Sequence, residues 1–77
     1  MELVLIEWID SAFMQGWMLK DKVKEHTISR IASVGILIHE DAEKITIVQD
    51  VSNKDDAADG ITIPKCCIKR IRKLRVR

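Results

Sequence analysis

The stretch Thr27-Ile-Ser-Arg-Ile-Ala-Ser-Val-Gly-Ile-Leu-Ile-His-Glu40 decides the fold, because it is long, rich in β-branched residues and interrupted by a single glycine. β-Branched side chains favour strands, so the stretch is predicted to form one long strand. Val34, Ile36 and Ile38 recur at every second position, and we expect them to face the core. Gly35 then marks the bend of a sheet that curls on itself. The polar side chains of the other face are Ser29, Ser33 and His39.

The segment Glu2–Asp10 is predicted to be the first strand, and it is apolar on both faces. Val4, Ile6 and Trp8 share one face and form the expected core side; Trp8 is therefore assigned to the core and not to base stacking. Leu3, Leu5 and Ile9 lie on the other face, which requires a cover. We expect this cover to be either the segment 11–19, with Phe13, Met14, Trp17 and Met18 folded back across it, or another subunit.

The remaining chain supplies short elements separated by polar segments. The expected elements are a helical turn or ordered loop at Lys20–Glu25, a hairpin strand at Lys44–Val51, a mobile connection at Ser52–Gly60, a short strand at Ile61–Ile63 ended by Pro64, one 3₁₀ turn at Pro64–Cys67 and a last strand from Ile68. With 77 residues, of which 18 are Ile or Val, the chain is predicted to be one all-β domain of about five strands.

These motifs resemble those of a group of small proteins encoded by bacteriophages and prophages. The resemblance rests on Trp8-Ile-Asp10, Gly16-Trp17, Ser33-Val-Gly35-Ile-Leu and Ile63-Pro64-Lys65, and it spans nearly the whole chain. It implies an SH3-like or Sm-like small barrel in proteins mostly without an assigned function. It brings no catalytic residues.

Charge is distributed unevenly along the chain. Residues 65–77 carry seven of the thirteen Lys and Arg residues and no acid, so this segment has a formal charge of +7 and the rest of the chain −6. Such a basic strand can bind phosphates without sequence preference. It can equally protect a sheet edge and pair with the acidic body. The candidate nucleic-acid contacts are Lys69, Arg70, Arg72, Lys73, Arg75 and Arg77.

Residues that could carry chemistry are few. The adjacent Cys66 and Cys67 do not have the two-to-four-residue spacing of structural zinc ligands, so His26 and His39 are not expected to complete a metal site with them. Instead, one cysteine is expected in the core and the other partly exposed. No pocket for a cysteine nucleophile is indicated, and there is no glycine-rich phosphate loop. We expect a protein without catalytic activity, cofactor or metal.

The function predicted from these patterns is a protein-interaction or self-assembling module, with weak nucleic-acid binding as the alternative. Apolar residues exceed the need of one small core at Leu3, Leu5, Ile9, Ile31 and Leu37. The predicted interaction face contains Leu3, Leu5, Ile9, Phe13 and Trp17. The longest apolar run is four residues, so no membrane span is expected, and the few cysteines favour the cytoplasm, that of a bacterial host if the chain is phage-encoded.

Overall fold

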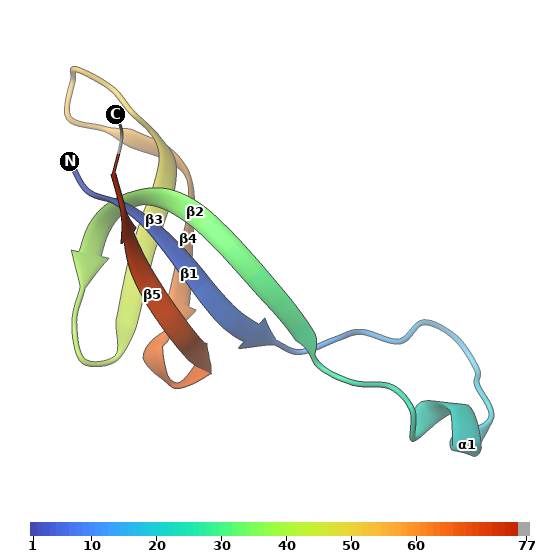
Figure 1. The fold of residues 1–77 in the computed structure, drawn as a ribbon. Helices are drawn as coiled ribbons and strands as arrows, with labels where there is room; N and C mark the ends of the chain where they lie inside the picture. The colour runs from blue at the N-terminus through green and yellow to red at the C-terminus, as the bar shows by residue number, and fades with distance from the viewer. Residues whose placement is uncertain (76–77) are drawn as a thin grey trace.

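The computed structural model describes residues 1–75 of the chain and contains five β-strands, one short α-helix and one 3₁₀ turn (Figure 1). The elements are β1 (Leu3–Asp10), α1 (Lys20–Val23), β2 (Ser29–Glu40), β3 (Lys44–Val51), β4 (Ala57–Pro64), η1 (Lys65–Cys67) and β5 (Ile68–Leu74). The predicted all-β class, the five strands, the helical turn and the 3₁₀ turn are confirmed.

The five strands form one antiparallel sheet in the order β4-β3-β2-β1-β5. Neighbours along the chain pair with each other, except that η1 carries the chain from β4 to the other side of the sheet, where β5 pairs with β1. β4 and β5 are therefore the two edges, and within residues 1–75 they form no ladder with each other. β2, the middle strand of the sheet, is long and strongly curved in Figure 1.

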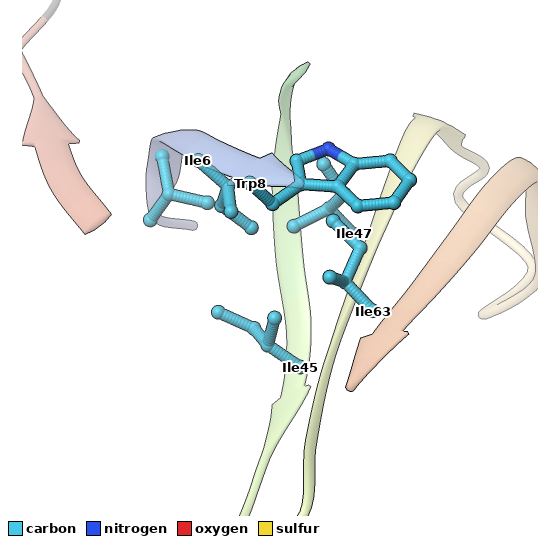
Figure 2. Close-up of a cluster of buried hydrophobic side chains, with 6 residues drawn as sticks. Ile6, Trp8, Ile45, Ile47 and Ile63 are labelled. Carbon is cyan, nitrogen blue, oxygen red and sulfur yellow. The ribbon is translucent and has the colours of Figure 1, made fainter. Parts of the chain in front are cut away.

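The core lies on one face of the sheet and is almost entirely aliphatic. It combines alternate residues of β1, β3 and β4, and the cluster consists of Val4, Ile6, Trp8, Ile45, Ile47 and Ile63. Figure 2 shows this cluster with five of its side chains labelled, among which Trp8 is the only aromatic one. The assignment of Val4, Ile6 and Trp8 to the core is confirmed, because none is more than 8% exposed.

The predicted orientation of β2 is wrong. Val34 is 48% exposed and Ile38 is 51% exposed, whereas Ile31 and Leu37 pack against the core. On the face of β2 that points to the core, Ser33 and Gly35 thus lie between the apolar residues Ile31 and Leu37. Ser33 accepts a hydrogen bond from the Trp8 indole N–H at 3.0 Å, so the polar side chain satisfies a donor that the core would otherwise leave unpaired.

Gly35 lies on this inward face, where β2 approaches β3 closely. A Cβ atom at Gly35 would lie 3.0 Å from both the Ile47 Cβ and the Val48 carbonyl oxygen. Contacts this short involve a backbone atom and a branched side chain, neither of which can swing aside. A glycine is therefore required for the close approach of β2 and β3.

Two boundaries in the second half of the chain differ from expectation. β4 begins at Ala57, so the predicted connection Ser52–Gly60 shortens to residues 52–56 and the predicted strand Ile61–Ile63 is longer. Asp59 has a φ of 58°, a left-handed conformation, and it lies inside β4. The hairpin strand Lys44–Val51 is confirmed at both ends.

Candidate interaction surfaces

The chain between β1 and β2, residues 11–28, forms an arm that projects away from the sheet (Figure 1). Phe13 is 87% exposed and Trp17 is 105% exposed, and Leu19 is also largely exposed. The prediction that this segment folds back over β1 is therefore wrong. The structure instead leaves two of the three aromatic side chains of the chain in solvent.

The arm is organised by local interactions alone. α1 is a single turn, and Lys22 and Glu25 flank its end with a 3.7 Å ion pair between Nζ and Oε2. Gly16 has a φ of 78°, a left-handed conformation that glycine adopts without steric cost. Within residues 1–75, no side-chain hydrogen bond or ion pair joins residues 12–28 to the sheet. Among the described residues, the polar contacts of the arm are thus confined to the arm itself.

The arm makes the molecule long and its surface large. The extents are 52 × 27 × 23 Å and the radius of gyration is 16.1 Å, against about 11.5 Å for a compact domain of this length. The accessible surface is 6590 Å², whereas a compact monomer of 8.8 kDa exposes about 4,800 Å². About 1,800 Å² is exposed beyond what a compact fold requires.

The second surface is the side of β5, β1 and β2 that faces away from the core, here called the outer face. Residues directly opposite each other in an antiparallel ladder share a face, so the register assigns its members. Its apolar residues are Leu3, Leu5, Ile9, Val34, Ile36 and Leu74, and its charged residues are Glu7, Arg30, Arg70 and Arg72. The predicted members Leu3, Leu5 and Ile9 are half-buried here.

Sequence reasoning missed the contributions of β2 and β5 to the outer face. Val34 lies opposite Leu5, and Leu74 lies opposite Leu3. The sequence also predicted that Ile31 and Leu37 exceed the need of the core. This prediction is wrong, because both residues pack against the core. The hydrogen bond of the Trp8 indole to Ser33 places Ser33 inward and Val34 outward, and it depends on the pairing register of β1 and β2, which the sequence pattern does not show.

Four of the six predicted basic residues, Lys69, Arg70, Arg72 and Lys73, lie on the edge strand β5, and two of these form ion pairs with glutamates in or next to β1. Arg70 Nε is 3.8 Å from the Glu7 carboxylate, and Lys73 Nζ is 3.4 Å from that of Glu2. Both pairs are about half exposed, so each contributes little to stability. Within residues 1–75, no carboxylate forms an ion pair with Lys69, Arg72 or Arg75. The remaining candidate, Arg77, lies outside the described residues.

A shallow hollow of about 340 Å³ lies at the end of the sheet from which the arm leaves. It is lined by Glu7, Trp8, Ile9, Arg30, Ile31, Ala32 and Lys69. The hollow shares Glu7, Ile9 and Arg30 with the outer face. It therefore extends the apolar surface of that face toward the base of the arm.

The cysteines and histidines do not form a common site. Cys66 is exposed and Cys67 is half-buried, so the expectation that one of them packs in the core is wrong. Their sulfur atoms are 3.9 Å apart, and the hydrogen bond between the two thiols raises the pKa of the Cys67 thiol. Residues 1–75 contain no cluster of three or more His, Cys, Asp or Glu side chains suited to a metal ion.

The turn between β2 and β3 contains Asp41, a carboxylate with a strongly lowered pKa. The side-chain hydrogen bond from His39, at 2.7 Å, and the backbone N–H groups of Glu43 and Lys44 lower the pKa of Asp41 to about 2. These interactions close the hairpin turn. They are exposed and do not border a hollow, so they indicate a structural role.

Comparison with known protein families, with curated proteins and with solved structures finds no match to this chain. Among the described residues, no helix is long and apolar enough to cross a membrane. The two surfaces defined above are therefore interpreted from their own geometry and chemistry.

Proposed function

We propose that this chain is a non-enzymatic, self-assembling interaction module of the small phage-protein type. The observation that carries the proposal is the arm, on which Phe13 and Trp17 are almost fully exposed. Aromatic side chains in such positions are the residues that most often dominate protein interfaces. Large apolar side chains that are exposed in this way favour association with a partner surface.

The class of fold that we propose is a small SH3-like or Sm-like barrel. Supporting features are the meander from β1 to β4, the η1 turn and the return of β5 to pair with β1. The glycine-dependent approach of β2 to β3 also fits a sheet that curls strongly. In such a barrel, the edge strands β4 and β5 would face each other across the gap where the sheet does not close.

Self-assembly is tested by measuring solution mass and arm accessibility together. Sedimentation equilibrium from low to high micromolar concentration should show a mass rising above 8.8 kDa. Trypsin should cleave the arm after Lys20, Lys22 or Lys24, all of which are exposed, and cleavage per molecule should slow as the mass rises. A mass of 8.8 kDa throughout, with concentration-independent cleavage, would contradict self-assembly.

A second candidate function is weak, sequence-independent nucleic-acid binding by β5. The observation that favours it is that Lys69, Arg72 and Arg75 form no ion pair within residues 1–75. Against it, Glu7 and Glu2 neutralise Arg70 and Lys73, and the sequence pI is only about 7.8. The protective role of a basic edge strand explains the same charges without a ligand.

The two explanations of the basic strand differ in their dependence on salt. If β5 contacts phosphates, the logarithm of the binding constant should fall by about 0.7–0.9 per phosphate for each unit of log salt. Replacing Arg70, Arg72, Arg75 and Arg77 by Ser should then abolish binding and preserve the fold. If the strand only protects an edge, no DNA or RNA should bind at low salt, and the same variant should aggregate.

A further inference from the structure

We infer that the arm of one copy packs its aromatic side chains on the outer face of a second copy. This inference rests on the proposed self-assembly and names the two surfaces that meet. Both surfaces carry apolar side chains and belong to the same chain, and within residues 1–75 no further element covers either of them. A second copy supplies a partner for both at once.

The arm cannot cover the outer face of its own chain in the observed geometry. It leaves the sheet at the junction of Asp10 with residue 11 and runs outward, away from the strands (Figure 1). The apolar stripe of the outer face runs back along β1 from Ile9 to Leu3, in the opposite direction. An arm directed away from its own sheet is suited to reach a neighbouring one.

The area available matches a stable assembly. Each chain exposes about 1,800 Å² beyond a compact monomer of its mass. If two chains bury this excess in exchanged contacts, the total is about 3,600 Å², which is within the range of roughly 2,000–5,000 Å² for obligate homodimers. Burial of the arm alone against an unrelated surface would leave the outer face exposed.

The chemistry of the two surfaces favours arm-to-face contact over face-to-face contact. The outer face carries the arginines Arg30, Arg70 and Arg72 but only one glutamate, Glu7, so pairing two outer faces would bring surfaces of like charge together, which is electrostatically unfavourable. An incoming arm instead offers the faces of Phe13 and Trp17, on which guanidinium groups stack favourably. Leu5 lies opposite Arg72, and Val34 lies opposite Leu5, so these two aliphatic side chains supply the apolar contact beside Arg72.

Two variants test the two sides of the contact, the arm and the outer face, separately. The arm variant combines Phe13→Ser with Trp17→Asp, both at positions that are exposed in the single chain. The face variant is Leu5→Glu, with Val34→Glu as a second version because Val34 is 48% exposed and tolerates the change more readily. The matched control is Val51→Glu, at an apolar residue that is 42% exposed on β3 and outside the outer face. Far-UV circular dichroism verifies that each variant folds.

The experiment measures self-association by sedimentation equilibrium and the composition of mixtures by native mass spectrometry. Each of the arm and face variants should weaken self-association at least about thirtyfold, whereas the control should associate as the parent does. Mixing the arm variant with the face variant should restore a one-to-one complex, because the intact arm of one meets the intact face of the other.

The outcomes distinguish this inference from the proposed function. If the parent remains a monomer at high micromolar concentration, self-assembly itself is wrong and the inference is wrong with it. If the parent assembles but the arm variant does so equally well, or the mixture stays monomeric, the arm-to-face contact is overturned and self-assembly stands. Restoration of the mixed complex supports the contact.

Discussion

The sheet and the arm place the same kinds of residue in opposite environments. Ile6 in the sheet is completely buried, whereas Phe13, seven residues later, is 87% exposed. The sheet satisfies its apolar side chains by packing β1 against β3 and β4, while the arm has only local contacts. The difference shows that apolar residues of β1 are used to fold the sheet, whereas those of the arm remain in solvent, where the proposed self-assembly would use them.

The most severe test of this comparison truncates one residue from each region. Ile6→Ala should lower the free energy of unfolding by about 2–5 kcal/mol, because it removes buried methyl groups and leaves a cavity. Phe13→Ala should change it by less than about 0.5 kcal/mol at concentrations where the chain is monomeric, because no packing is lost. Urea denaturation at low protein concentration measures both. Equal effects would show that the arm packs on the sheet in solution.

A smaller effect is expected from adding volume where β2 meets β3. Gly35→Val should destabilise the protein by about 1–3 kcal/mol or more, because its Cβ would press on Ile47 and the Val48 carbonyl. Ala32→Val is the control, since Ala32 is exposed and lies opposite Glu7 on the outer face of the same strand. The control should be neutral or slightly stabilising in thermal unfolding. Tolerance of valine at both positions would contradict the close approach.

The smallest effect concerns the hairpin turn and depends on pH. The Asp41 pKa is lowered from 3.8 to about 2, so the ionised carboxylate stabilises the fold above about pH 4 and loses this contribution as the pH falls through 2. As the pH falls from about 4 to about 2, the free energy of unfolding should therefore decrease less for the Asp41→Ala variant than for the parent. Urea unfolding midpoints of both proteins at several pH values give the comparison. Parallel pH profiles would show that the turn does not hold Asp41 as described.

Much of the fold follows from local patterns. The ends of β3, the 3₁₀ turn before β5 and the core side of β1 were predictable because alternation, turn residues and proline act over a few neighbours. The strongest candidate residues for association, Phe13 and Trp17, were also identified from the sequence, although their position in the fold was not. The basic character of β5 was predictable from the sequence. Its ion pairs with Glu2 and Glu7 were not, because they depend on the register in which β5 pairs with β1.

The sequence by itself determined that β2 is a strand with two different faces; only the tertiary structure decided which face is buried. A period of two cannot distinguish inside from outside when both faces carry apolar residues. That choice depends on neighbours distant in the chain: the Trp8 indole requires the Ser33 hydroxyl, and Ile47 leaves no room for a side chain at Gly35. The direction of the arm is likewise tertiary, because its local contacts do not specify where it lies relative to the sheet.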